Sequence, residues 1–296
     1  MADMFFVMPH VRACRPCDRA YFRAAIESLR RQTDPHWQLV IADDGSPPEI
    51  QRELRKLESA DSRIHVLLGK RNLGPGYRRN EGIRYAARAG AEAILFLDAD
   101  DEAHPDRVRI TRKVFEEEPC VDVIYSPFHV IDERGELVPL EKLTPSIRQI
   151  LNNYRQPPPE GTGLWRIFGL ETGYLNLTSA TSVRITLALR QPFPSHRVSE
   201  DFHTWLRYAA DGGFFRFIAH IPARYRIPRS AGSHSRARLG RAFYMHKARV
   251  DREGFELALQ IARRRGEIKA EQIPDLLSAF DRHLRSLLSE EQIQLS

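Results

Sequence analysis

Short apolar runs alternate with amphipathic stretches along the first 125 residues of the chain. Four of the runs, at residues 5–8, 37–42, 64–68 and 93–97, have the length and composition of buried strands. The segments between them repeat apolar residues at helical spacing, and a glycine-rich turn at residues 72–76 leads into one that continues through Ala89. Strands separated by helices predict βαβ units, and therefore an α/β fold with a Rossmann-like, mostly parallel central sheet.

The rest of the chain has a less regular pattern. It predicts a helix over residues 144–154, a helix over residues 199–210 with Ser199 as its cap, and several short strands. The strands are expected at residues 121–126, 128–132, 214–218 and 223–227, and further helices at residues 236–265 and 273–288. Residues 156–163, which read Gln-Pro-Pro-Pro-Glu-Gly-Thr-Gly, cannot form regular structure and are expected to be a loop.

Polar side chains follow each of the four early strands. His10 comes after the first strand, Asp43 after the second, Asn72 after the third, and Asp98 with Asp100 after the fourth. In open parallel sheets, ligands bind outside the carboxyl ends of the strands. These side chains are therefore expected to converge on one site, and their convergence is more informative than any one of them.

Asp98 and Asp100 lie two residues apart at a strand end, so the alternation of strand side chains predicts that both carboxylates point the same way. Converging carboxylates offer the oxygen ligands that Mg²⁺ and Mn²⁺ prefer, with room for phosphate oxygens. A solvated acidic loop is the alternative for an isolated Asp-x-Asp motif. The position after a buried strand, beside the other polar clusters, favours the metal site.

Two further motifs are candidates for ligand contacts. Asp43 opens the run Asp-Asp-Gly-Ser, where a carboxylate could accept hydrogen bonds from a nucleobase or from ribose hydroxyls, although Asp-Gly is also common in turns. The pattern Asn72-x-Gly74-x-Gly76 lets the backbone approach a ligand closely, but it lacks the spacing of a P-loop. Arg79 opens the following helix and could meet a diphosphate or face water.

Two adjacent acids, Glu200 and Asp201, stand at the start of the helix expected over residues 199–210. The helix dipole stabilises a carboxylate in the first turn, which accounts for one of the pair. A carboxylate in this place could also act as a general base that removes a proton from a hydroxyl group. The pair is therefore a candidate for catalysis.

The chain has 296 residues and 45 Lys and Arg against 39 Asp and Glu, and its net charge of +6 favours an anionic partner. Residues 221–265 alone hold 12 basic and 3 acidic residues, so the remainder is slightly acidic. A nucleic acid, a membrane surface or a phosphorylated small molecule would each fit this charge. Basic residues at 226–241 could close over a diphosphate, and the later helices could meet an anionic acceptor, a membrane surface or a partner in a homodimer.

The sequence has no apolar run long enough to cross a membrane, and the run at residues 4–8 is too short for a signal peptide. We therefore expect a cytoplasmic protein. Three cysteines are too few for a disulfide framework. The spacing of Cys14 and Cys17 also occurs in thioredoxin redox motifs, but the rest of the chain lacks the pattern of a thioredoxin domain.

Taken together and in this order, the motifs resemble the family 2 glycosyltransferases, which have the GT-A fold. The resemblance runs from about Phe5 to His234, with Asp98-Ala99-Asp100 in the place of the family's DXD motif. It implies that Asp201, paired with Glu200, is the catalytic base, and that Asp100 and Asp98 hold a divalent metal ion, Mg²⁺ or Mn²⁺. The residues implied to bind a nucleotide sugar are Pro9, His10, Asp43, Asp44, Asn72, Gly74, Arg79, Asp98 and Ala99.

The resemblance also implies a reaction. An inverting glycosyltransferase would move a sugar from a nucleotide diphosphate sugar, expected to be a UDP-sugar, to an acceptor hydroxyl by direct displacement, with no covalent intermediate. The acceptor could be a glycan, a glycolipid or a small natural product. Residues 1–125 would form the nucleotide-sugar-binding half of a GT-A domain, residues 126–235 its acceptor-binding half, and residues 236–296 a helical extension.

Two features depart from the family pattern. The family often has a Tyr-Arg-x-His sequence near a late metal ligand, whereas this chain reads Tyr-Arg-Ile-Pro at residues 225–228. His234 could replace that histidine as a contact to the metal or the diphosphate, or it could be a surface residue of a basic loop. The insertion that holds Cys14 and Cys17 could reshape the base pocket or only form a loop.

Three other functions stay open. A sugar-phosphate nucleotidyltransferase also uses acidic metal sites, but it would show a glycine-rich basic loop near the N-terminus, and residues 10–18 contain no glycine. A catalytically inactive protein that binds a nucleotide sugar would keep the scaffold, although the metal carboxylates and the Glu-Asp pair are all present. A nucleic-acid-binding protein would fit the charge, but no known binding motif supports it.

Overall fold

The computed structural model describes residues 4–11, 16–154, 157–228 and 241–290. The strands of its main sheet are β1 (Met4–His10), β2 (Trp37–Asp43), β3 (Ile64–Leu67), β4 (Ala93–Phe96), β5 (Val123–Tyr125), β7 (Thr181–Arg184) and β8 (Phe215–Phe217). They are arranged in the order β3-β2-β1-β4-β7-β5-β8. β7 runs antiparallel to both neighbours and the other pairs are parallel, so the predicted mostly parallel sheet is confirmed. A parallel pair, β6 (Phe128–Ile131) and β9 (Ala223–Arg226), forms a second sheet.

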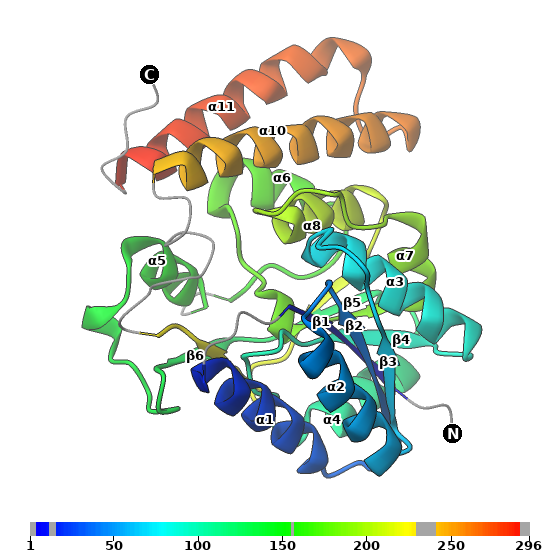
Figure 1. The fold of residues 1–296 in the computed structure, drawn as a ribbon. Helices are drawn as coiled ribbons and strands as arrows, with labels where there is room; N and C mark the ends of the chain where they lie inside the picture. Colours follow the sequence, from blue (N-terminus) through cyan, green and yellow to red (C-terminus); the bar gives the residue numbers. More distant parts are fainter. Residues whose placement is uncertain (1–3, 12–15, 155–156, 229–240, 291–296) are drawn as a thin grey trace.

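Helices cover both faces of the main sheet, as Figure 1 shows. They are α1 (Pro16–Arg30), α2 (Pro48–Ala60), α3 (Pro75–Arg88), α4 (Arg107–Glu117), α5 (Pro145–Asn153), α6 (Trp165–Ile167), α7 (Ile185–Arg190), α8 (Glu200–Ala210), α10 (Arg241–Arg264) and α11 (Ile273–Glu290). α1, α2 and α4 lie on one face, and α3, α7 and α8 lie on the other. α10 and α11 form a further layer outside α8.

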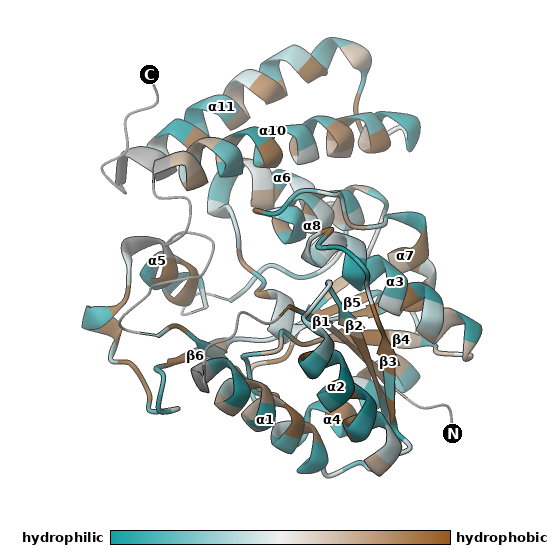
Figure 2. Ribbon diagram, in the orientation of Figure 1, coloured by the Kyte–Doolittle hydropathy of each residue, from teal (hydrophilic) through white to brown (hydrophobic). Residues whose placement is uncertain are grey.

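The alternation of side chains along β1 supplies apolar groups to both faces of the sheet. Phe5 and Val7 belong to a buried cluster that extends to Trp205 of α8. Phe6 and Met8 belong to a second cluster, which contains the apolar faces of α1 and α4. Figure 2 shows the strands mostly brown and the helices divided between brown and teal faces, as a sheet buried on both sides requires.

The two C-terminal helices share the core of the sheet domain. Phe255 of α10 is fully buried, 6.1 Å from the Trp165 ring and stacked at 4.4 Å on Phe280 of α11. A Cβ atom added at Gly169 would lie 2.2 Å from the Phe255 ring, so this residue must be glycine for the helix to pack so closely. None of the helices described is both long enough and apolar enough to span a membrane.

Most predicted elements form within a residue or two of their expected bounds, but the pattern missed α4, α6, α7 and β7. β7 has the sequence Thr-Ser-Val-Arg, which holds one apolar residue, and it forms because two flanking strands supply its hydrogen-bond partners. Ser199 holds the predicted N-cap position of α8, but its side chain makes no capping hydrogen bond. This residue precedes α8 with a left-handed φ of 57°, and its hydroxyl donates to Asp251 of α10 instead of capping the helix.

Phe255→Ala tests whether α10 is part of the core. Removal of a buried ring should leave a cavity and lower the free energy of unfolding by about 3–5 kcal/mol, measured by urea denaturation. Leu257→Ala is the control on the same helix, because this side chain is 42% exposed and its loss should change the free energy by less than about 0.5 kcal/mol. Equal effects of the two substitutions would contradict the packing described above.

Candidate active site

The carboxyl ends of β1 and β2 bring two of the predicted residues together. His10 and Asp43 are register partners on these strands, and both are buried, with 3.4 Å between His10 Nδ1 and Asp43 Oδ1. The other carboxylate oxygen accepts hydrogen bonds from the Ser46 N–H at 3.1 Å and from Gln51 Nε2 at 3.0 Å. Burial opposes ionisation of Asp43, but these hydrogen bonds outweigh it and hold the pKa of Asp43 below its ordinary value. Asp43 is therefore an ionised acceptor at the edge of the sheet, and Pro9 precedes His10 on the same strand.

Asp44 holds the glycine-rich turn in place. Its carboxylate accepts hydrogen bonds from the backbone N–H groups of Leu73 and Gly74, at 2.6 and 2.9 Å, and from Arg78 Nε at 2.9 Å. Gly74 has a φ of +94°, which favours glycine at this position. Asn72 is exposed, and its backbone carbonyl accepts a hydrogen bond from Arg197 at 2.9 Å. The backbone of the turn thus lies near the strand ends, and the buried Asp44 carboxylate holds it there through hydrogen bonds to its N–H groups.

Arg79 connects the segments that carry the predicted acids. From α3, its Nη1 atom donates to Glu200 at the start of α8 and its Nη2 atom donates to Asp98 after β4, both at 2.7 Å. The side chain is 3% exposed, and its guanidinium carbon lies 5.3 Å from the Phe193 ring centre. One buried cation thereby joins the predicted DXD and Glu-Asp motifs.

The charges around Arg79 set its protonation and that of its partner. Burial disfavours the guanidinium, but the carboxylates of Asp98 and Glu200 outweigh it and raise the pKa of Arg79. Burial, reinforced by the neighbouring charge of Asp201 and opposed by Arg79, raises the pKa of Glu200 from 4.5 to about 7. The charge of the Glu200 carboxylate therefore depends on the presence of the Arg79 guanidinium.

Asp201 is oriented by hydroxyl groups from a different part of the chain. Its Oδ2 atom accepts hydrogen bonds from the Tyr174 hydroxyl at 2.8 Å and from Thr178 Oγ1 at 3.0 Å. Its Oδ1 atom accepts from the backbone N–H of Phe202 at 2.9 Å. Burial and the charge of Asp201 raise the pKa of Tyr174 well above its ordinary value, so this phenol stays a hydrogen-bond donor.

The loop after β4 has a different geometry from the one predicted. β4 ends at Phe96 and residues 99–100 form a turn, so Asp98 and Asp100 do not lie on the strand and its alternation does not orient them. The loop is positioned instead by Ser179, whose hydroxyl oxygen accepts from the Asp98 N–H at 2.9 Å and donates to Asp101. Asp98, Ala99 and Asp100 are half-buried, whereas Asp101 is buried.

Arg226 fixes the same loop from β9. Its guanidinium donates to the backbone carbonyls of Asp100 and Asp132, at 2.9 and 2.7 Å, and to Glu102 at 2.7 Å. Its own N–H donates to Asp101 at 2.8 Å. Because all of these donors are engaged inside the protein, Arg226 positions the loop and does not project toward a diphosphate.

The acidic groups of the site act on a common neighbour, Tyr225. Burial and the charges of Asp101, Asp100, Asp98 and Asp201 all raise the pKa of this tyrosine. Burial and the charges of Asp100 and Asp98 likewise raise the pKa of Asp101 well above its ordinary value. The site therefore has an excess of negative charge on oxygen ligands, and this donor set fits a divalent cation such as Mg²⁺ or Mn²⁺.

Several site residues were not predicted from the sequence. Tyr174, Thr178 and Ser179 belong to none of the motifs singled out above. Asp101 stands directly after the Asp98-Ala99-Asp100 motif, but no role was predicted for it. Arg226 was predicted to close over a diphosphate, whereas the structure engages it with the loop after β4. Of the predicted residues, His234 and Cys14 lie outside the described part of the chain, and so does the side chain of Cys17.

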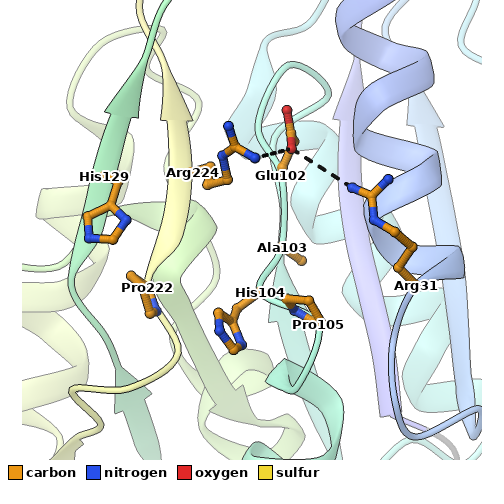
Figure 3. Close-up of a pocket in the computed structure, with 8 residues that line it drawn as sticks. All are labelled: Arg31, Glu102, Ala103, His104, Pro105, His129, Pro222 and Arg224. Carbon is orange, nitrogen blue, oxygen red and sulfur yellow. Dashed lines mark ion pairs between the residues drawn. The ribbon is translucent and has the colours of Figure 1, made fainter. Parts of the chain in front are cut away.

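A separate pocket lies beside the loop that follows β4 (Figure 3). Figure 3 shows Arg31, just after α1, and Arg224 of β9 both directed at the carboxylate of Glu102, with separations of 4.0 and 3.3 Å. Arg226 contacts the same carboxylate. Glu102 therefore links the end of α1 and β9 to this loop. The two arginines that line the pocket are paired with the glutamate between them.

Comparison with known proteins identifies the family. Residues 7–172, more than half of the chain, match the model of glycosyl transferase family 2. The chain belongs to this family. An uncharacterised glycosyltransferase of Methanocaldococcus jannaschii is 25% identical over 210 residues, which are 70% of this chain and 66% of that protein. One from Rickettsia conorii is 35% identical over 114 residues, 38% of this chain and 18% of that protein, so the chain spans less than two thirds of either relative.

Two solved structures of glycosyltransferases have the same fold. TarS of S. aureus, in complex with UDP-GlcNAc, matches with a TM-score of 0.56 at 18% identity, over 96% of this chain and 83% of that one. The mannosyltransferase PcManGT of Pyrobaculum calidifontis, in complex with GDP-Man and Mn²⁺, matches with a TM-score of 0.57 at 13% identity, over 99% and 76%. The predicted GT-A fold is confirmed.

Arg79→Met tests the central ion contact. The substitution leaves two carboxylates without their shared cation, and we expect the free energy of unfolding to fall by about 3–5 kcal/mol at pH 8. The pKa of Glu200 in the folded state is already raised from 4.5 to about 7, and loss of Arg79 raises it further. The folded variant therefore binds a proton more readily than the folded wild type, so the loss should shrink as the pH falls from 8 to 5.

Chemical denaturation of the variant and the wild type at both pH values measures this effect. Adding Glu200→Gln to the Arg79→Met variant should recover part of the stability at pH 8, because the unpaired charge is then absent. A destabilisation that is the same at pH 5 and pH 8 would contradict the electrostatic explanation.

Proposed function

We propose that this chain is an inverting glycosyltransferase that moves a sugar from a nucleotide diphosphate sugar to an acceptor hydroxyl. The observation that carries the proposal is the bridge from Arg79 to Asp98 and Glu200, because it joins the loop proposed to bind a metal to the start of the helix that holds the proposed base. Membership of glycosyl transferase family 2 supports the same reaction class.

The donor half of the proposed site is built on the strand ends. Asp43 is an ionised, buried acceptor suited to the N–H of a base or to ribose hydroxyls, with Pro9 and His10 beside it. The turn at Asn72 and Gly74 offers backbone close to the same edge. TarS has been solved with UDP-GlcNAc and PcManGT with GDP-Man, so both nucleotides have precedent in this fold, and we propose UDP for this chain.

Asp100 and Asp98 are the residues proposed to hold Mg²⁺ or Mn²⁺, and PcManGT was solved with Mn²⁺. The ion, when bound, would offset the charge that develops on the leaving diphosphate. Arg79 holds Asp98 from the protein side, while Ser179 and Arg226 set the path of the loop. The ligand atoms are thereby held before a donor arrives.

Asp201 is the proposed general base. Tyr174 and Thr178 both donate to its Oδ2 atom, and these bonds fix its direction. The base would take the proton of the acceptor hydroxyl as its oxygen attacks the anomeric carbon, and the bond from that carbon to the diphosphate would break on the opposite side. One displacement of this kind inverts the configuration.

Other parts of the predicted function stay predictions. They are the acceptor, the assignment of residues 126–235 to acceptor binding, the separate extension at residues 236–296, and contact of the basic helices with a membrane or a second copy. An inactive scaffold that binds a nucleotide sugar is the second candidate function, and transfer assays on the variants below separate it from an enzyme.

Asp201→Asn tests the base. The amide keeps a hydrogen-bond acceptor for Tyr174 and Thr178 but cannot take a proton, so we expect kcat to fall by about 10²–10⁴-fold with donor binding unchanged. Release of nucleoside diphosphate from a panel of nucleotide sugars measures the rate. Asp211→Asn, at the other end of α8 and paired with Arg190, is the matched control and should keep the wild-type rate. Transfer at the wild-type rate by Asp201→Asn would remove this residue as the base.

Asp100→Ala tests the metal site. We expect it to weaken Mn²⁺-dependent binding of UDP by at least about tenfold, because one charge-assisted contact contributes about 1.5–3 kcal/mol. Binding in the presence of a chelator should be the same as for the wild type. Asp106→Ala is the control, since that carboxylate bonds Thr33 and Arg109 at the surface. If Asp100→Ala keeps the full effect of Mn²⁺, the metal binds elsewhere.

A further inference from the structure

A second cluster of metal-ligating side chains lies between α8 and α10, apart from the acidic site. His196 comes from the loop before α8, His203 from α8 and Glu253 from α10. His196 Nε2 lies 3.0 Å from Glu253 Oε2, and His203 Nε2 lies 3.8 Å from Glu253 Oε1. The three potential ligand atoms are all within 4.8 Å of one another.

His203 points to a ligand because it is buried with one ring nitrogen unsatisfied. Its side chain is 2% exposed, and Nε2 has no hydrogen-bond partner within the described chain. Burial, together with the charges of Arg207 and His196, lowers the pKa of His203 to about 3, so the ring is neutral. A buried ring nitrogen without a partner carries a free-energy penalty, and a metal ion bound at Nε2 would give this nitrogen a partner.

The spacing of the cluster suits a four-coordinate ion. Zn²⁺ binds imidazole and carboxylate at about 2.0–2.2 Å in tetrahedral sites, which places ligand atoms roughly 3.3–3.6 Å apart. The separations of 3.0 and 3.8 Å lie on either side of this range. The side chains of His196 and Glu253 are 26% and 46% exposed, so an ion can enter from solvent and water can fill the fourth position.

We propose that His196, His203 and Glu253 bind one Zn²⁺ ion. Two imidazoles and one carboxylate favour Zn²⁺ over Mg²⁺, which takes oxygen ligands. The ion would join α10 to the first turns of α8, because its ligand His203 lies three residues after Glu200 in the sequence. It would therefore hold the helix that carries the candidate base without taking part in the transfer.

Coordination requires a change of tautomer at His203. Arg207 Nε now donates to Nδ1 at 3.1 Å, which leaves the ring proton on Nε2. When Nε2 binds the ion, this proton moves to Nδ1, and no proton is lost from the ring. Arg207 Nε keeps its second acceptor, the carbonyl of His203 at 3.3 Å, and the guanidinium keeps the carbonyl of Pro192 at 2.7 Å.

Calorimetric titration of chelator-treated full-length protein with ZnCl₂ in excess MgCl₂, which occupies the oxygen site, tests the proposal. We expect one Zn²⁺ per chain with a dissociation constant below about 1 µM, and at least about tenfold weaker binding in His196→Ala and in Glu253→Gln. Zn²⁺ at about one hundred times this constant should raise the melting temperature by about 5 °C, and Mg²⁺ should not.

His36→Ala is the matched control, because His36 forms a surface pair with Asp34 but has no second imidazole. It should bind Zn²⁺ as the wild type does. The visible absorption of bound Co²⁺, lost in His196→Ala and Glu253→Gln, gives a readout of nitrogen ligation that does not depend on activity. Absence of Zn²⁺ binding in this range, or binding unchanged in both variants, would leave the cluster as a plain ion pair and overturn the proposal.

Discussion

The guanidinium of Arg79 is a buried cation whose position sets the geometry of the whole acidic site. Burial of such a charge is costly, and here two hydrogen bonds of 2.7 Å, to Asp98 and Glu200, offset the cost. The three groups belong to α3, to the loop after β4 and to α8. The contact that satisfies the cation therefore also holds these elements together, and Asp201 follows directly on one of the two carboxylates.

The second half of the chain supplies the contacts that give the site its shape. Ser179 stands just before the antiparallel strand β7, and its hydroxyl bonds both the Asp98 N–H and the Asp101 carboxylate. Arg226, on β9, holds the carbonyl of Asp100. Tyr174, in the loop between α6 and β7, directs Asp201. The loop proposed to bind a metal and the candidate base are thus held by residues that belong to neither motif.

The C-terminal helices extend this support to the start of α8. Ser199 adopts a left-handed backbone immediately before Glu200, and its hydroxyl donates to Asp251 of α10. Such a backbone conformation is unfavourable for a residue other than glycine and persists where the surroundings determine it. Phe255, four residues further along α10, packs in the same core as α8. The C-terminal helices therefore contribute to the placement of the candidate base, in addition to any surface they offer.

The sequence by itself determined the early strands, the polar residues at their ends and the family, because burial periodicity and motif spacing are properties of residues near one another in the chain. It could not determine β7, whose residues Thr-Ser-Val-Arg show no strand pattern, or the turn that replaces strand alternation at Asp98 and Asp100. Only the tertiary structure decided that Arg79 lies between its two carboxylates and does not face solvent. Its contact with Glu200 joins residues 121 positions apart, and which acids a buried cation meets depends on what the folded chain brings within reach.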